Sequence, residues 1–233
     1  YISLSELNKS ELSDEKDKVK ELISDISHQT KTPAANIILY ANLLAESCSD
    51  EQKTAVSEIL RQSEKLNMLI QALVKASRLE TGIISVVPSE NSVNKLIDEC
   101  VFVMIPKSEN KHITVNVRCE AADALFDMKW TTEAIGNILD NAVKYSCENT
   151  SIDVSVTEYE LFVRIDIQNE GIAIPDDEQP KIFQRFYRSP EVHDIDGIGI
   201  GLYLAREIIS SQGGYIKVSS NRKTMFSVFL PKK

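Results

Sequence analysis

The sequence has no apolar run that approaches the roughly 18 residues of a membrane-spanning helix, and its N-terminus lacks a signal-peptide profile, so we expect a soluble segment. Cysteine is scarce: the four thiols are far apart, with no Cys-x-x-Cys pair and no zinc-like grouping with the three histidines. Such spacing is typical of reduced cytosolic thiols. Positive charge is also in deficit, because 26 basic residues face 35 acidic ones. The net charge of -9 disfavours nucleic acid or an anionic membrane as the main partner.

Apolar residues are present in sufficient number to build real cores, since they make up 42% of the 233 residues. The spacing of the apolar residues changes between Gly82 and Pro88, two residues that commonly interrupt helices and strands. We therefore expect two domains, over residues 1–82 and 83–233, with a linker at about 81–88.

The N-terminal third has apolar and small residues at alternating spacings of four and three, which is the pattern of a bundle helix. It predicts one helix near 5–46 and a second near 51–80, joined by a short turn. Two such helices form an antiparallel hairpin with more apolar surface than it buries alone, so we expect it to dimerise into a four-helix bundle. The first helix carries the pattern on Val19, Ile23, Ile26, Thr30, Pro33, Ile37, Tyr40 and Leu44.

His28 lies outside this apolar pattern, on the outward face of the first helix if Ile26 is a core position. A solvated imidazole keeps a pKa of about 6.5 and is then a competent nucleophile near neutral pH. A single outward histidine is more often an ordinary surface residue. However, Pro33 interrupts the helix by removing an amide donor, and bundles rarely keep such a defect without a use. The combination favours a functional His28.

Short β-like runs alternate with helical patterns after residue 88, and this order favours an α/β sandwich with a mixed sheet. The predicted helices lie near 92–104, 130–145 and 199–212, and the predicted strands near 113–118, 151–157, 161–168, 215–219 and 225–230.

A polar face is predicted on the helix near 130–145, where Asn137, Asn141 and Lys144 recur at spacings of four and three. Amide oxygens with an ammonium beside them suit a magnesium-bound polyphosphate. Ordinary surface helices carry such faces too, so the motif indicates a site only together with others.

Three further motifs follow in the second half. Asn169–Pro175 begins at the end of an apolar strand and contains a glycine that lets backbone approach a ligand. Ile182–Arg188 combines aromatic residues with two arginines, whose forked donors suit phosphate. Gly197–Leu202 is rich in glycine and opens a helix, and its amides form an anion site.

In this order the four motifs resemble the N, G1, F and G2 boxes of the catalytic ATP-binding domain of sensor histidine kinases. That domain is a Bergerat-type sandwich shared with gyrase, MutL mismatch-repair and heat-shock chaperone ATPases. The first half resembles the dimerisation and histidine-phosphotransfer domain of the same family, on His28, Pro33 and the segment Arg78–Gly82 that closes the hairpin. The resemblance covers nearly the whole chain.

The resemblance implies roles for individual residues. Asn137 would ligate Mg²⁺, Asn141 and Lys144 would meet the phosphates of ATP, and Asn169 would read the adenine. Glu133, one turn before Asn137, would help to order the reacting group. The other nucleotide-binding positions implied are Tyr145, Gly171, Ala173, Ile174, Arg185, Arg188 with a lid at about 189–196, Gly197, Gly199, Gly201 and Leu202.

Two departures from the family pattern each remove a carboxylate. Gln29 follows the phosphoacceptor where the family usually has Glu or Asp, and loss of a general base typically costs about 10²–10⁴ in rate. Asn169 stands where the family usually has aspartate, so it keeps an acceptor oxygen but loses charge assistance on the order of 1 kcal/mol. Ala173 also replaces a glycine of the motif.

The resemblance implies that the chain uses ATP·Mg to phosphorylate His28 and then passes the phosphoryl group to an aspartate of a response regulator. Thr32 resembles the residue that positions water for dephosphorylating the regulator, although a hydroxyl packed beside Pro33 is the plainer alternative. The family also implies the cytoplasmic portion of a bacterial membrane-anchored sensor. Two alternatives stay open: a degenerate kinase that acts as a regulator-binding scaffold or phosphatase, and a gyrase- or chaperone-like ATPase, against which the His28 motif argues.

Overall fold

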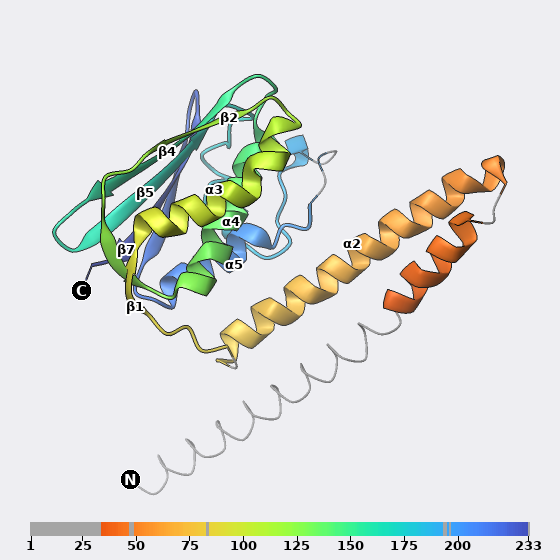
Figure 1. Cartoon of the computed structure of the whole chain (residues 1–233), viewed down its shortest axis with the longest axis horizontal. Coiled ribbons are helices and arrows are strands. Elements are labelled where there is room, and N and C mark those ends of the chain that lie inside the picture. The colour runs from red at the N-terminus through yellow and green to blue at the C-terminus, as the bar shows by residue number, and fades with distance from the viewer. Residues whose placement is uncertain (1–33, 47–48, 83, 193–194, 196, 233) are drawn as a thin grey trace, which may run out of the picture. The chain divides into compact units, whose positions relative to one another are not determined.

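The computed structural model describes residues 34–46, 49–82, 84–192, 195 and 197–232, and the chain divides into two compact units between Ser85 and Val86 (Figure 1). The first unit is helical, and the second combines helices with a sheet. The predicted order, a helical part followed by an α/β domain, is therefore confirmed. No helix in these described stretches is long and apolar enough to cross a membrane.

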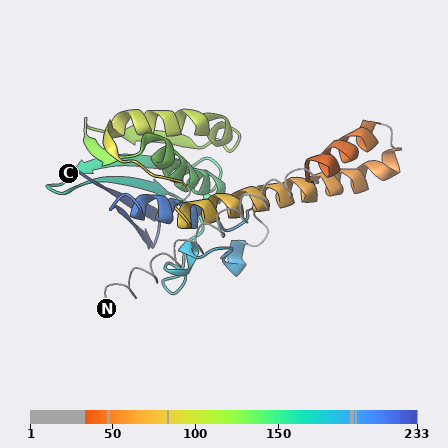
Figure 2. The ribbon, with the colours of Figure 1, turned by 90° about the horizontal axis from the view of Figure 1, so that it is seen from below.

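The first unit contains the helical residues 34–46 and the long helix α2 (Asp50–Glu80), which lie side by side in both views (Figures 1 and 2). Helix α2 begins after Ser49, whose backbone N–H donates to Gln52 Oε1 at 3.2 Å in a capping box. The chain leaves α2 through Gly82, whose φ of 70° is the left-handed conformation that often terminates helices. Residues 1–33, His28 among them, lie outside the described part of the chain.

The second unit is built on a mixed five-stranded sheet of order β2-β4-β5-β7-β6, in which only β2 and β4 are parallel. A small antiparallel sheet pairs β1 with β3. The strands are β1 (Ser89–Ser92), β2 (Thr114–Arg118), β3 (Asp123–Phe126), β4 (Ser151–Glu158), β5 (Phe162–Asn169), β6 (Tyr215–Ser220) and β7 (Thr224–Pro231). The helices are α3 (Val93–Glu109), α4 (Met128–Tyr145) and α5 (Gly201–Ser210), with short 3-10 helices at η1 (Lys181–Phe183) and η2 (Pro190–Val192).

The core of this unit lies between one face of the sheet and the three helices, with α4 packed between α3 and α5 (Figure 2). Alternate residues of the central strands point into it, as the period of a strand requires. Fully burying one such side chain contributes about 1.5–3 kcal/mol. The buried side chains include Val163, Ile165 and Ile167 of β5, Val228 and Leu230 of β7, Ile138 of α4 and Ile208 of α5.

Two features of the second unit differ from the expectation. The small β1-β3 sheet was not predicted, because Ser89–Ser92 is a short polar run without an apolar alternation. Helix α3 continues to Glu109, past Pro106. Pro106 has no N–H to donate to the Phe102 carbonyl, so the helix lacks one bond there, while the Pro106 carbonyl still accepts the Asn110 N–H at 3.3 Å.

The cysteines give a direct test of this packing. Cys100 is 2% exposed, its thiol points to the Thr132 carbonyl at 3.6 Å, and burial raises its pKa to about 12. Because the thiolate is the reactive form, we expect Cys100 to resist iodoacetamide at pH 8 in the folded chain, while exposed Cys147 reacts. Peptide mapping by mass spectrometry measures both sites, and labelling of unfolded chain is the control. Equal labelling of Cys100 and Cys147 in the folded chain would contradict the packing of α3.

Candidate functional site

The N-terminus of α4 is held by its own cap residue, Asp127, and by the side chain of Gln212. Asp127 caps the helix by accepting the Trp130 N–H at 3.1 Å, and its other carboxylate oxygen accepts the Val87 N–H at 3.0 Å. Gln212, just beyond α5, accepts the Asp127 N–H at 2.5 Å and donates to Thr131 Oγ1 at 3.1 Å. Because Gln212 is buried, these bonds tie the start of α4 to the end of α5.

The C-terminus of α4 is capped by a residue that the sequence did not indicate. The Lys111 ammonium donates to the carbonyls of Val143, Lys144 and Ser146 at 3.2, 2.7 and 3.3 Å. A cation at this end meets orphan carbonyls and the negative end of the helix dipole. Lys111 precedes the whole of α4 in the chain and is therefore distant in sequence from these acceptors, so no local pattern marks it.

The polar face of α4 meets the glycine loop before α5. A Cβ on Gly197 would lie 2.3 Å from Lys144 Nζ, and one on Gly201 would lie 3.3 Å from Asn137 Oδ1. Among the described residues, the buried Asn137 Nδ2 has no hydrogen-bond partner. The structure therefore brings Asn137 and Lys144 against Gly201 and Gly197, as the motifs require, and leaves a buried amide to be satisfied by something else.

Helix α5 starts in this loop and exposes backbone donors to it. Its first residue is Gly201, and the preceding Ile200 has no side-chain group that could cap the helix. The first amides of a helix have no partner within it, and together with the helix dipole they favour an anion. Leu202 lies in this first turn, and an anion bound there would be close to Asn137.

The segment after β5 packs against the last turn of α4. Gly171 pairs with Ser146 in a β-bridge, and a Cβ on Gly171 would lie 1.9 Å from the Tyr145 carbonyl oxygen. Only glycine allows that approach. Burial raises the pKa of Tyr145, although the charge of Arg188 acts in the opposite direction.

Asn169 occupies a buried corner at the end of β5. The residue is only 4% exposed, and its strand partner on β7 is Thr224. Thr224 Oγ1 and Ser220 Oγ are 2.7 Å apart, and Ser220 Oγ accepts the Ile174 N–H at 2.8 Å. Thr224 and Ser220 were not predicted as site residues, because single hydroxyls in strands carry no sequence signal.

The aromatic motif and the glycine loop are joined through their backbones. The Phe186 N–H donates to the Gly199 carbonyl at 2.8 Å, and both residues have positive φ, of 62° and 75°. A positive φ is uncommon for phenylalanine and is kept only where surrounding contacts impose it. A Cβ on Gly199 would lie 2.6 Å from the Tyr187 carbonyl oxygen, so this junction needs glycine.

The two arginines of that motif have different surroundings. Arg185 donates to the Tyr203 hydroxyl at 3.0 Å, and its guanidinium lies 4.8 Å from the centre of that ring, on α5. Arg188 donates to the carbonyls of Val192, at 2.7 Å, and Ile195. Arg188 thereby holds the segment predicted as the lid, of which residues 193, 194 and 196 lie outside the described part.

For the other predicted site residues, the structure gives a position on an element and a degree of burial, or nothing. Glu133 and Asn141 lie one turn before and one turn after Asn137 on α4, and all three are half-buried. Ala173 is exposed in the segment after β5. His28, Gln29 and Thr32 lie outside the described residues. Within the described stretches, no group of three His, Cys, Asp or Glu side chains could hold a metal ion.

Comparison with known proteins assigns both units. Residues 18–82 match the family model of the His Kinase A (phospho-acceptor) domain. Residues 126–233 match the model described as histidine kinase-, DNA gyrase B-, and HSP90-like ATPase. The histidine protein kinase SaeS of Staphylococcus aureus is 31% identical over 224 residues, which are 91% of this chain and 62% of SaeS. The chain thus spans less than two thirds of this relative.

Solved structures share the fold. ShkA, crystallised full-length in complex with AMPPNP, is 21% identical and superposes with a TM-score of 0.76 over 91% of this chain and 45% of its own. The histidine kinase ThkA, in complex with the response regulator protein TrrA, is 20% identical with a TM-score of 0.68, covering 98% of this chain and 67% of its own.

The junction at Gly199 can be tested against a glycine inside a helix, Gly136 of α4. Gly199→Ala should destabilise the chain by about 1–3 kcal/mol, because alanine is strained at positive φ and meets the Tyr187 carbonyl. Gly136→Ala is the matched control: it lies inside α4 with nothing within 4 Å of a new Cβ, so it should stabilise by about 0.5–1 kcal/mol. Urea unfolding followed by the fluorescence of Trp130, the single tryptophan, reports both. A neutral Gly199→Ala would show that the junction tolerates a side chain.

Proposed function

This chain belongs to the sensor histidine kinases, and we propose that it uses ATP to phosphorylate its own His28 and passes the phosphoryl group to an aspartate of a response regulator. The observation that carries the proposal is the contact of Asn137 and Lys144 with the glycine loop at the start of α5. It joins two motifs that are far apart in the sequence into one phosphate-binding arrangement.

The residues present fit ATP with Mg²⁺. The buried Asn137 amide without a described protein partner, the glycines that leave room beside Lys144 and the uncapped amides of α5 are all features that a polyphosphate would complete. Mg²⁺ commonly takes one or two protein oxygens and fills its other positions with phosphate and water. Asn137 Oδ1 would hold it here, without a carboxylate cluster. When bound, the ion neutralises the charge on the phosphate oxygens.

The chain's own groups divide the work of phosphoryl transfer. Lys144 and the α5 amides would orient the phosphates, with Asn141 beside them, and Asn169 would contact the base. The neutral His28 imidazole would attack the γ-phosphorus, forming a nitrogen–phosphorus bond while the bond to the departing ADP oxygen breaks. The ring proton then leaves to solvent, because Gln29 cannot accept it near neutral pH. We therefore propose a slow kinase.

We propose a response regulator as the partner because a protein of the same fold was crystallised with one. ThkA, which shares this fold, was crystallised with a response regulator protein. In this chain Thr32 follows His28 by four residues in the sequence and would position water for removing phosphate from the regulator. Placement of this portion on the cytoplasmic side of a membrane-anchored sensor also stays a prediction.

We further propose that the first unit forms a homodimer. Ile59, Leu66 and Leu73 of α2 recur once per heptad and are 48%, 47% and 43% exposed in the single chain. The same face has a shallow depression lined by Glu58, Ile59, Gln62, Ser63 and Leu66. A heptad repeat of apolar residues that stays exposed is typical of a helix that packs against a partner helix.

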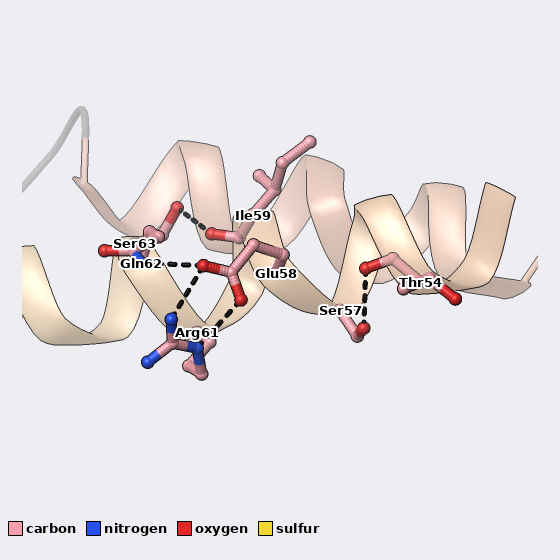
Figure 3. Close-up of polar contacts among 7 residues, drawn as sticks. All are labelled: Thr54, Ser57, Glu58, Ile59, Arg61, Gln62 and Ser63. Atoms are coloured by element: carbon pink, nitrogen blue, oxygen red, sulfur yellow. Dashed lines mark hydrogen bonds and ion pairs between the residues drawn. The ribbon is translucent and has the colours of Figure 1, made fainter. Parts of the chain in front are cut away.

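Charged side chains flank this stripe and leave it apolar. Arg61 donates to Glu58 at 2.7 and 2.9 Å and Gln62 donates to it at 2.7 Å, while the Ile59 side chain points to the opposite side of the helix from Arg61 (Figure 3). Bonds from Arg61 and Gln62 lower the pKa of Glu58 to about 2, so it stays ionised at the rim of the stripe. Such an arrangement suits an apolar seam with a polar edge.

Leu66→Glu should convert the dimer to a monomer, because it would bury an unpaired charge in the dimer interface. The fold of the single chain should tolerate the change, because Leu66 is exposed there. Gln71→Glu adds the same charge at an exposed position off the stripe and should leave the dimer intact. Multi-angle light scattering at micromolar concentration measures the mass. A wild-type monomer, or a Leu66→Glu dimer, would refute this interface.

The kinase activity is tested by two variants, one that should lose only phosphate incorporation and one that should also lose ATP binding. His28→Gln should abolish incorporation of acid-labile phosphate from γ-labelled ATP yet bind ATP normally, because the acceptor and the nucleotide site lie in different units. Asn137→Ala should lose both magnesium-dependent ATP binding and incorporation. His112→Asn, at an exposed position with φ of 55° that asparagine tolerates, and Gly136→Ala are the matched controls.

The outcomes separate the proposal from its alternatives. Phosphate incorporated into the His28→Gln variant would place the acceptor elsewhere. A wild-type chain that binds ATP·Mg but incorporates no phosphate would favour the regulator-binding scaffold. Turnover of ATP that His28→Gln leaves unchanged would favour an ATPase of the gyrase or chaperone class.

A further inference from the structure

We propose that the base subsite of this chain accepts purine nucleotides with an oxygen at position 6, such as inosine triphosphate, nearly as well as ATP. The inference rests on the proposed function, since it assumes that Asn169 contacts the base. It concerns the polarity of the corner formed by Asn169, Thr224 and Ser220, which we call the base corner.

The base corner is buried and lies beside the phosphate-binding part of the site. Asn169, Thr224 and Ser220 are 4%, 4% and 7% exposed. Two residues beyond Asn169, Gly171 packs on the Tyr145 carbonyl at the end of α4. Lys144 directly precedes Tyr145 on α4. The phosphates of a nucleotide whose base lies in the base corner would therefore be within reach of Lys144.

Every side chain in the base corner can both donate and accept a hydrogen bond. The Asn169 carboxamide has an oxygen acceptor and an NH₂ donor, and Thr224 and Ser220 carry hydroxyls. In the 2.7 Å bond between Ser220 and Thr224, either hydroxyl could be the donor. Ser220 Oγ accepts the Ile174 N–H, and its own hydroxyl hydrogen can be donated to Thr224 Oγ1. The Thr224 hydroxyl hydrogen can then rotate toward an acceptor or away from a donor on a bound base.

Nothing in the described surroundings imposes one polarity on Asn169. No hydrogen bond fixes its carboxamide among the residues that the structure describes. The adjacent carboxylate, Glu170, is paired with the Lys223 ammonium at 2.6 Å, so its charge is balanced outside the base corner. The carboxamide can therefore flip at little cost and exchange its donor for its acceptor.

The two purine edges differ by the same exchange. Adenine presents an amino donor at position 6 and an acceptor at N1, whereas hypoxanthine presents an acceptor at O6 and a donor at N1. A carboxylate offers acceptors only and would face O6 with like polarity, which rejects the second base. A carboxamide pairs with either edge. An asparagine in place of a carboxylate at position 169 therefore removes the discrimination between adenine and hypoxanthine, and it does not remove binding of the base.

The deciding experiment compares the dissociation constants of ATP and inosine triphosphate by isothermal titration with Mg²⁺ and the full chain. Inosine triphosphate is chosen because it lacks the 2-amino group of guanine, so that only the polarity of the edge changes. We expect the two constants to agree within about tenfold. Asn169→Asp should tighten ATP and weaken inosine triphosphate, which widens their ratio by about 10- to 100-fold.

Gln168→Glu is the matched control, because it makes the same amide-to-carboxylate change one residue earlier, on the other face of β5. It should leave the ratio unchanged. A wild-type preference for ATP above about 100-fold would overturn the inference, and this comparison needs no variant to fold. An Asn169→Asp ratio equal to the wild-type ratio would overturn it too, since the base would then not be read there. If wild-type chain binds neither nucleotide, the proposed function itself fails.

Discussion

The site depends on the anchoring of one helix at both of its ends. Helix α4 carries the polar face that meets the glycine loop, and it lies between α3 and α5 on the sheet. Asp127 and Gln212 hold its first turn to the end of α5, and Lys111 satisfies the carbonyls of its last turn. Because a rotation or slide of α4 would break bonds at both ends, its polar face is held in one register against the loop.

The same anchoring leaves particular groups unsatisfied where a ligand would bind. The Asn137 amide has no described partner, the α5 amides have no side-chain cap, and Phe186 is held at positive φ by the backbone of Gly199. A chain optimised only for stability would remove such defects. They are grouped between α4, α5 and the aromatic motif, where we propose that a polyphosphate binds.

In the proposed reaction, the two missing carboxylates would act on different steps. Gln29 follows the phosphoacceptor in the sequence and would concern proton transfer, whereas Asn169 would set the polarity of the base corner and concern recognition. Neither change disturbs the phosphate-binding part of the site, which keeps Asn137, Lys144 and the glycines. We therefore propose that the chain still holds a nucleotide, and that Asn169 and Gln29 alter which nucleotide is chosen and how fast it is used.

The sequence by itself determined the local elements and the order of the motifs. Spacings of three and four marked α2 and α4, alternation marked β4, β5 and β7, and the glycines marked the start of α5, because side-chain periodicity follows directly from backbone geometry. The short β1-β3 sheet escaped, since Ser89–Ser92 carries no such period.

Only the tertiary structure decided which groups from distant segments complete the site. Lys111 reaches carbonyls at the far end of the following helix, Gln212 reaches back to Asp127 from beyond α5, and Thr224 joins Asn169 through strand pairing. A sequence pattern shows which face of an element is buried, but it carries no record of what covers that face. Partners in long-range contacts are set by packing in three dimensions, and for that reason the base corner and the cap of α4 became visible only in the fold.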